Sequence, residues 1–360
     1  MKVSRLSVGL VALAIGALLG AAHPAGAQNT SVFAVGLNNP RGLKFGPDGN
    51  LYVAEGGVGG TSINTIGQCT QVPFPVGPYT TDGPSARISK IDSKGTVTTV
   101  IDGLPSSQTT PLTGAFVSGV GDVAFIGHTL YAVLSGAGCS HAFPDFPNSV
   151  IRVNDNGTFT QIANLSEFVM NNPVAHPDLA DFEPDGTWYS MISVRSKLYA
   201  VEPNHEEMDA ISSLDGAVNR VIDMSQVPWV GPTAVTYRGN FFIGNLGMFP
   251  ASVGDGSIYK VTPSGQIKVA QHGFMAELGV AFDNRGRLYV LETFDVAGFP
   301  TPFTGDILRI DGSGQVETIA SGLAFPTAMT FGPDGNLYVS NFGFGFPPGA
   351  GQIVKVSVPR

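Results

Sequence analysis

The chain has 360 residues, 28 of them acidic and 19 basic, and its formal net charge at pH 7 is -9. Lys and Arg never form a run, so we expect no nucleic-acid partner. Charged residues make up only 13% of the chain, whereas there are 47 Gly and 26 Pro residues. This composition favours an all-β protein with many tight turns.

Residues 1–27 have the pattern of a secretory signal peptide. Lys2 and Arg5 precede an apolar run that ends in the small residues 25–27. No later segment contains the roughly 18 uninterrupted apolar residues that a membrane span requires. We therefore expect residues 28–360 to form one domain that is secreted or periplasmic and is not inserted into a membrane.

The rest of the chain is repetitive. The stretch FGPDGNLYV occurs at residues 45–53 and again at residues 331–339. Its Leu-Tyr-Val strand belongs to a pattern with six copies, namely 51–55, 130–134, 198–202, 241–245, 288–292 and 337–341. A short apolar strand and a turn precede each copy, and two further strands follow in most of them. The sequence shows no extended helical periodicity.

Six units of four strands predict a six-bladed β-propeller. The last unit ends with its third strand, at residues 352–358. The segment 31–37 resembles a fourth strand and belongs to no preceding unit. We expect it to complete the last blade, which leaves neither strand as a free edge. The third unit departs from the pattern, since residues 181–188 (DFEPDGTW) precede its first strand.

Oxygen-bearing residues end five of the six second strands. They are Glu55, Glu202, Asn245, Glu292 and Asn341. Because these strands end on one face of a propeller, the five residues are candidate ligands for a hard cation such as Ca²⁺. His176, His205 and Asp178 could join that site. The alternative is that these polar groups cap neighbouring backbone or face solvent.

The loops that follow the second strands carry Phe-Pro sequences in five units. Their phenylalanines form a candidate rim for a flat, apolar ligand. The members are Phe74, Phe143, Phe146, Phe249, Phe299, Phe303 and Phe346. The alternative is that the rings pack inward beneath the loops. Two of these loops hold Cys69 and Cys139, the only cysteines, which can pair in an oxidising compartment.

Several longer motifs resemble the ScyD/ScyE family. They are residues 36–55 (GLNNPRGLKFGPDGNLYVAE), 201–205 (VEPNH), 244–247 (GNLG) and 338–345 (YVSNFGFG). The resemblance covers nearly all of the chain after the signal peptide. It implies a secreted or periplasmic six-bladed propeller similar to NHL-repeat proteins. It brings no established catalytic residues with it.

Two hypotheses of function follow. In the first, the chain is a ligand-binding or scaffold module that uses the Phe-Pro loops and the strand-end residues to bind a small molecule or a protein. In the second, it is a metal-dependent hydrolase of the lactonase or gluconolactonase kind, or a quinoprotein-like oxidoreductase. A propeller hosts many chemistries, so the fold alone does not decide between them.

Overall fold

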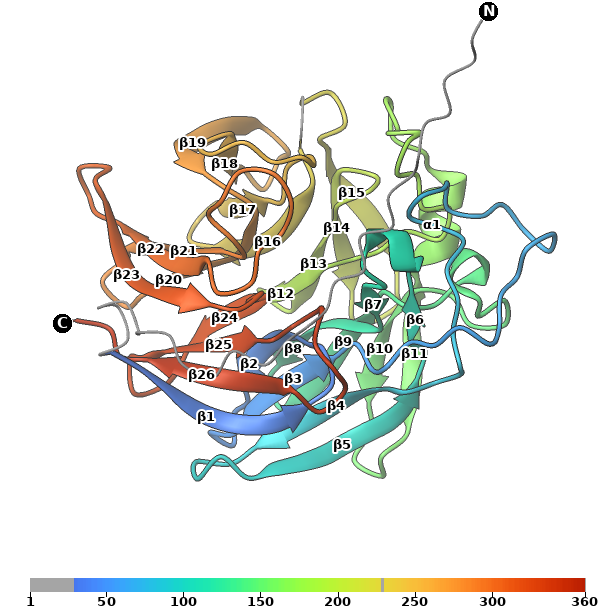
Figure 1. The fold of residues 1–360 in the computed structure, drawn as a ribbon, viewed down its shortest axis with the longest axis horizontal. Helices are drawn as coiled ribbons and strands as arrows, with labels where there is room; N and C mark the ends of the chain where they lie inside the picture. Colours follow the sequence, from blue (N-terminus) through green and yellow to red (C-terminus); the bar gives the residue numbers. More distant parts are fainter. Residues whose placement is uncertain (1–28, 228–229, 360) are drawn as a thin grey trace, which may run out of the picture.

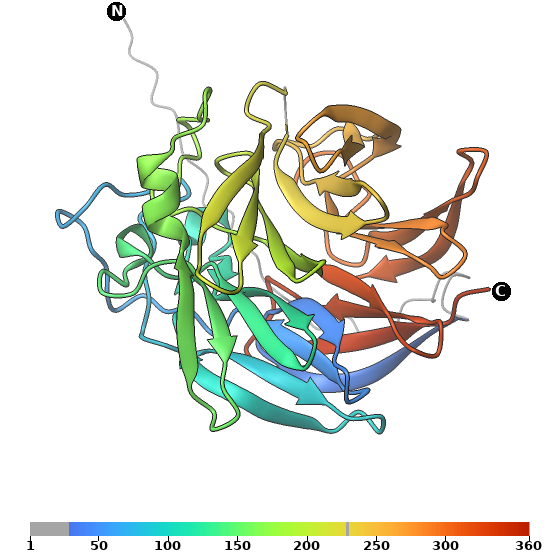
Figure 2. The same cartoon turned by 180° about the vertical axis from the view of Figure 1, so that it is seen from behind.

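Six antiparallel sheets of four strands surround a central channel in the computed structural model, which describes residues 29–227 and 230–359 (Figure 1). The six-bladed β-propeller predicted from the repeats is therefore confirmed. The predicted signal peptide lies outside the described residues. Figure 2 shows the same ring from behind, with one sheet following the next in chain order.

In blades 1 to 5 the innermost strand comes first in chain order. Blade 1 contains β2 (Pro40–Phe45), β3 (Leu51–Glu55), β4 (Ala86–Ile91) and β5 (Val97–Leu104). Blade 2 contains β8 (Val120–Ile126), β9 (Thr129–Leu134), β10 (Ser149–Val153) and β11 (Phe159–Asn164). Blade 3 contains β12 (Ser190–Val194), β13 (Lys197–Glu202), β14 (Glu207–Ser212) and β15 (Val218–Asp223).

The remaining blades follow the same plan. Blade 4 contains β16 (Pro232–Tyr237), β17 (Phe241–Asn245), β18 (Gly256–Val261) and β19 (Ile267–Phe274). Blade 5 contains β20 (Glu277–Phe282), β21 (Leu288–Glu292), β22 (Gly305–Ile310) and β23 (Val316–Leu323). Blade 6 contains β24 (Ala328–Phe331), β25 (Leu337–Asn341), β26 (Gly351–Val356) and β1 (Thr30–Leu37).

Strand β1 closes the ring. It pairs antiparallel with β26, from Thr30 opposite Val356 to Leu37 opposite Gly351. Figure 1 shows β1, in blue, beside the red strands of blade 6. The predicted closure is confirmed, and its physical reason is that β26 gains a hydrogen-bonded partner in place of an open edge.

The repeated Phe and Tyr positions pack blade against blade. In four blades the last residue of the inner strand, or the one before it, is a phenylalanine that contacts an aromatic ring in the second strand of the preceding blade. The pairs are Phe45 with Tyr338, Phe125 with Tyr52, Phe282 with Phe242, and Phe331 with Tyr289, at centroid distances of 5.0 to 5.1 Å. Their edge-to-face geometry is the one that aromatic pairs prefer. The identical copies of FGPDGNLYV thus supply rings to successive interfaces between blades.

The two copies also form the same turn. Asp48 accepts hydrogen bonds from the Asn50 amide and from the Tyr52 hydroxyl. Asp334 accepts the corresponding bonds from Asn336 and Tyr338. Gly49 and Gly335 adopt φ of 78° and 79°, the left-handed region that glycine enters without a steric penalty.

A few short elements lie outside the sheets. They are β6 (Ser107–Gln108), η2 (Pro111–Thr113), β7 (Val117–Ser118), η3 (Cys139–His141) and α1 (Leu165–Asn171). Asn164 caps α1, because its side chain accepts a hydrogen bond from the Glu167 amide. Within the described residues, no helix is long and apolar enough to cross a bilayer.

Candidate functional site

Two kinds of loop meet on one face of the ring, which we call the loop face. One kind follows each second strand, and the other enters each inner strand. Glu55, at the end of β3, pairs with Pro40, at the start of β2, and blades 4 and 5 repeat this pairing. The opposite face, formed by the hairpin turns between first and second strands and between third and fourth strands, is called the hairpin face.

The oxygen-bearing residues at the second-strand ends hold the loops that enter their own blades. Each of the five accepts a hydrogen bond from a backbone amide just before the inner strand. For Glu55, Glu202, Asn245, Glu292 and Asn341 the donors are Asn38, Thr187, Gly231, Met275 and Ala324, at N···O distances of 2.5 to 2.9 Å. All five side chains are buried. The structure therefore gives these residues the capping role.

The cation site predicted on these five residues stays a prediction. Within residues 29–227 and 230–359, no group of three or more His, Cys, Asp or Glu side chains is arranged to hold a metal ion. Glu55 also accepts bonds from Arg87 and Ser89 on the neighbouring strand. The predicted Ca²⁺ site gains no support from this geometry, because each candidate ligand is already bonded within its own blade.

Several buried carboxyls at the loop face have raised pKa values. Burial raises the pKa of Glu202 and of Glu277 to about 8. Burial, together with the charge of Asp306 on the facing strand, raises the pKa of Glu292 to about 9. Neither carboxyl oxygen of Glu277 has a hydrogen-bond partner among the described residues, and both lie close to the backbone of Gly256.

Stability is expected to fall as the pH rises from about 4.5 to 8. In that window the folded chain keeps a proton on Glu277 that the unfolded chain has lost, so unfolding becomes easier by on the order of 1 kcal/mol per pH unit. Glu277→Gln, which is always neutral, should remove this contribution and stabilise the protein at pH 8 more than at pH 5. Urea unfolding at several pH values measures the difference. The exposed Asp145→Asn is the control, and an equal pH dependence in Glu277→Gln and the wild type would contradict the assignment.

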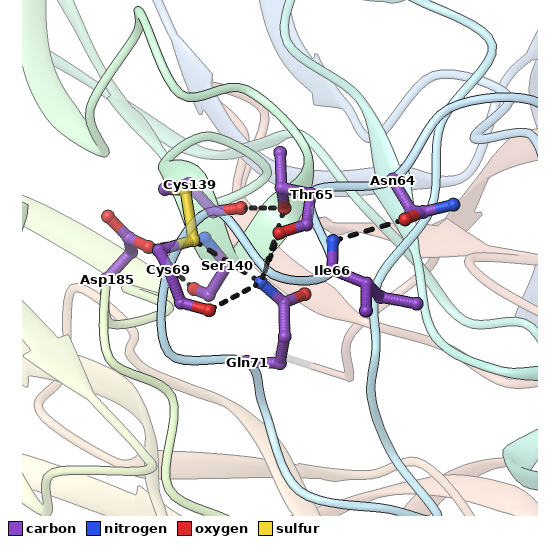
Figure 3. Close-up of a disulfide and its surroundings, with 8 residues drawn as sticks. All are labelled: Asn64, Thr65, Ile66, Cys69, Gln71, Cys139, Ser140 and Asp185. Carbon is purple, nitrogen blue, oxygen red and sulfur yellow. Dashed lines mark hydrogen bonds between the residues drawn. A yellow bond between two sulfur atoms is a disulfide. The ribbon is translucent and has the colours of Figure 1, made fainter.

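A disulfide ties the loops of blades 1 and 2 together. Cys69, in the long loop of blade 1, bonds Cys139 in η3, which confirms the predicted pairing (Figure 3). The Thr65 hydroxyl donates to the Cys139 carbonyl. The Gln71 amide donates to the carbonyls of Thr65 and Cys69, at 3.1 Å each. The loop around the disulfide is thus fixed by its own side chains.

The two residues after Cys139 bind acidic residues that enter blade 3. The Ser140 amide and hydroxyl donate to the Asp185 carboxylate, at 2.7 and 2.6 Å (Figure 3). His141 Nε2 lies 3.1 Å from Glu183 Oε2, and the Tyr79 hydroxyl from blade 1 donates to Glu183 Oε1 at 2.7 Å. Burial lowers the pKa of His141, but the Glu183 carboxylate raises it above its usual value. We call Tyr79, His141 and Glu183 the buried triad.

Asp181 lies next to the buried triad and is partly exposed. Asn204 donates to Asp181 Oδ2 at 3.0 Å, while Asp181 Oδ1 has no partner among the described residues. Burial, helped by the charges of Glu183 and Asp178, raises the pKa of Asp181 to about 8. A carboxyl that holds its proton at neutral pH can act as a general acid.

The three residues that the sequence suggested as additional cation ligands lie in two different environments. His205 is buried, and its Nε2 lies 2.8 Å from the Glu183 carbonyl. His176 and Asp178 are exposed. The repeat pattern of the sequence does not single out Tyr79, His141, Asp181 or Glu183. Two signals pointed toward them, namely the irregular acidic segment 181–188 and the position of His141 two residues after a cysteine.

Phenylalanines from three parts of the chain meet at the loop face. Six rings form the phenylalanine cluster, linked at centroid distances of 4.3 to 6.5 Å: Phe116, Phe303, Phe325, Phe342, Phe344 and Phe346. Phe303, Phe325 and Phe342 have φ of 64°, 46° and 55°. Such angles are strained for bulky residues and are concentrated at functional sites in proteins.

Only some of the phenylalanines predicted to form a rim lie together in one cluster. Phe303 and Phe346 belong to the phenylalanine cluster, whereas Phe249 and Phe299 stack on each other with centroids 6.5 Å apart. Phe74 is 72% exposed. Phe143 is half-buried beside η3, and Phe146 packs inward against Phe159 with centroids 5.6 Å apart. The inward-packing alternative therefore holds for Phe146.

Arg41 and Tyr189 cross the channel beside the phenylalanine cluster. Arg41 donates to the Tyr189 hydroxyl at 3.3 Å and to the Val117 carbonyl at 2.5 Å. Tyr189 in turn donates to the Thr327 carbonyl at 3.4 Å. Residues that enter blades 1, 3 and 6 are thereby joined across the axis. We call this pair the Arg41–Tyr189 bridge.

No protein-family model and no curated protein sequence matches this chain. Solved structures do match its fold. A Thermus thermophilus protein that is assigned as an oxidoreductase (glucose dehydrogenase) superposes with a TM-score of 0.58 at 14% identity, covering 91% of this chain and 99% of that one. The PQQ-bound aldose sugar dehydrogenase of Streptomyces coelicolor gives a TM-score of 0.55 at 12% identity, covering 94% and 100%.

A gluconolactonase of Xanthomonas campestris gives a TM-score of 0.53 at 9% identity, covering 92% of this chain and 89% of that one. At such identities the likeness establishes the six-bladed fold alone. The neighbours include both hydrolases and oxidoreductases, so they agree in architecture while differing in chemistry.

Proposed function

We propose that this chain is an exported binding protein whose loop face holds a flat aromatic or otherwise apolar small molecule against the phenylalanine cluster. The observation that carries the proposal is the convergence of six rings, three of them on residues with a left-handed backbone. Strain of this kind costs about 1–3 kcal/mol per residue, and it persists where the arrangement of side chains serves a function.

The exposure of nearby side chains supports a binding role. Phe303 is 60% exposed, Phe299 is 69% exposed and Phe249 is 40% exposed. Other exposed apolar residues in loops of the same face are Val58, Ile63, Leu112, Leu179, Met248, Val253 and Val296. Exposed apolar side chains that gather on one face of a protein are a feature of interaction sites. The disulfide and the predicted signal peptide support export.

Binding of the neutral fluorophore N-phenyl-1-naphthylamine tests the proposal. We expect saturable binding to the wild type. The double variant Phe303→Ser/Phe346→Ser should weaken it about tenfold or more, because two stacking surfaces are lost. Phe74→Ser, which removes an exposed ring of the same face outside the cluster, should leave the affinity unchanged. Equal loss in both variants, or no saturable binding at all, would count against the phenylalanine cluster as the site.

Asp181 favours a second candidate, hydrolysis of a lactone by general acid catalysis. The supporting observation is a carboxyl with a pKa raised to about 8 and one unpartnered oxygen at the loop face. Acid release from a panel of lactones, with and without EDTA, measures this activity and its dependence on a metal. Asp181→Asn should abolish hydrolysis, whereas Asp145→Asn, at an exposed carboxylate in another loop of the same face, should retain it. If both variants are as active as the wild type, Asp181 has no such role.

A further inference from the structure

A cavity of about 630 Å³ opens at the hairpin face, at the end of the channel away from the phenylalanine cluster. It is lined by the last residues of all six inner strands. Its volume falls within the roughly 300–1,000 Å³ that small-molecule sites occupy in proteins.

The lining of this cavity combines aromatic, basic and polar residues. Four of the phenylalanines that pack between blades are among its lining residues, namely Phe45, Phe125, Phe282 and Phe331. Lys44 and Arg195 line it as well, and none of its lining residues is acidic. Among the residues that the structure describes, neither cation forms an ion pair with a carboxylate. Arg195 therefore has no carboxylate partner among these residues, whereas Lys44 also faces the buried Asp122 carboxyl in the narrow space next to the cavity.

The wider charge distribution strengthens this feature. The chain as a whole has a net negative charge, but most of its basic residues lie near the hairpin face. They occupy the hairpin turns and the strand ends next to these turns. They are Lys44, Lys90, Lys94, Arg152, Arg195, Lys197, Arg238, Lys260, Lys268, Arg285, Arg287, Arg309 and Lys355. Asp283, Glu317 and Asp334 form ion pairs with three of them. Other turns of the same face carry Asp48, Asp92, Asp155, Asp215 and Asp311. The excess of basic over acidic residues on this face favours a ligand of negative charge.

The cavity is closed from the loop face. Above it the channel narrows to a space of about 20 Å³, lined in part by Lys44, Asp122 and Met329. The Arg41–Tyr189 bridge crosses the channel nearer the loop face. A molecule in the cavity must therefore enter from the hairpin face, and it cannot touch the phenylalanine cluster.

We propose that this cavity is a second binding site, which takes a small aromatic carboxylate. The aromatic body of the ligand packs among the phenylalanine rings, and its carboxylate meets Lys44 inside the cavity and Arg195 at the mouth. Charge-assisted hydrogen bonds to a carboxylate are the strongest polar contacts that such a site offers. The site is independent of the one under the proposed function.

Titration calorimetry with 2-naphthoate tests the proposal on the full chain. We expect one saturable site whose affinity falls as salt increases. Lys44→Gln and Arg195→Gln should each weaken binding about tenfold. Arg195 is exposed in a turn, so its variant keeps the fold, and Lys197→Gln removes a nearby charge outside the cavity as the matched control. The neutral analogue 2-naphthamide should bind at least tenfold more weakly than 2-naphthoate.

The two sites are distinguished by exchanging variants and probes. Phe303→Ser/Phe346→Ser should leave 2-naphthoate binding intact, and Lys44→Gln should leave N-phenyl-1-naphthylamine binding intact. The proposal is overturned if 2-naphthoate shows no saturable binding, if Lys197→Gln weakens it as much as Arg195→Gln, or if it binds through the phenylalanine cluster. If the cavity binds only water, 2-naphthoate will show no saturable binding.

Discussion

Replacing Leu37 by Ala is expected to lower the free energy of unfolding by about 2–5 kcal/mol, the usual cost of truncating a buried leucine. Leu37 ends β1 and is fully buried in a core shared by blades 6 and 1, with neighbours that include Leu43, Leu51 and Ile353. The substitution still allows the backbone of β1 to pair with β26, but it creates a cavity in the hydrophobic core next to β1. Because β1 closes the ring, the loss should appear in global unfolding.

Val35 provides the matched control, since it lies on the same strand and is 62% exposed. Val35→Ala should change stability by about 0.5 kcal/mol or less, as surface substitutions do. Both variants can be measured by urea unfolding monitored by circular dichroism. If Leu37→Ala is as stable as Val35→Ala, the strand that closes the ring contributes little to global stability.

Removal of the disulfide, in Cys69→Ser/Cys139→Ser, is expected to cost about 4 kcal/mol. The bond spans 70 residues, and a loop of that length loses entropy of this size when it is closed in the unfolded chain. Equilibrium unfolding of the oxidised protein and the double variant measures the difference. The reduced wild type should match the double variant, and reductant should leave the variant unchanged. Equal stability of the oxidised wild type and the variant would show that the bond does not constrain the unfolded chain.

The fold could be predicted because its information is local and repeated. Each unit carries its own turn residues and alternating apolar positions, and the copies of FGPDGNLYV keep the contacts of Asp48 and Asp334. Closure by β1 followed from counting strands. The sequence did not reveal why Phe and Tyr recur together, since Phe125 and Tyr52 meet only when two blades are side by side.

The candidate site was harder to predict because it depends on irregular loops. Tyr79 and Glu183 are 104 residues apart, and no period connects them. The pattern correctly placed oxygen-bearing residues at the strand ends, but their hydrogen bonds go to backbone amides, which carry no side-chain signal. Glu277 was missed because it starts an inner strand, where the repeats otherwise carry small, apolar or proline residues.

The pairing of β1 with β26 also determines the orientation of the protein when one end of the propeller is attached to a surface. Thr30 and Val356 are paired at the start of β1 and the end of β26, so the chain both begins and finishes its propeller on the hairpin face. A linker or solid support joined next to either residue therefore orients the protein in one way. The phenylalanine cluster then points outward to the medium, while the basic cavity faces the attachment surface and is shielded by it.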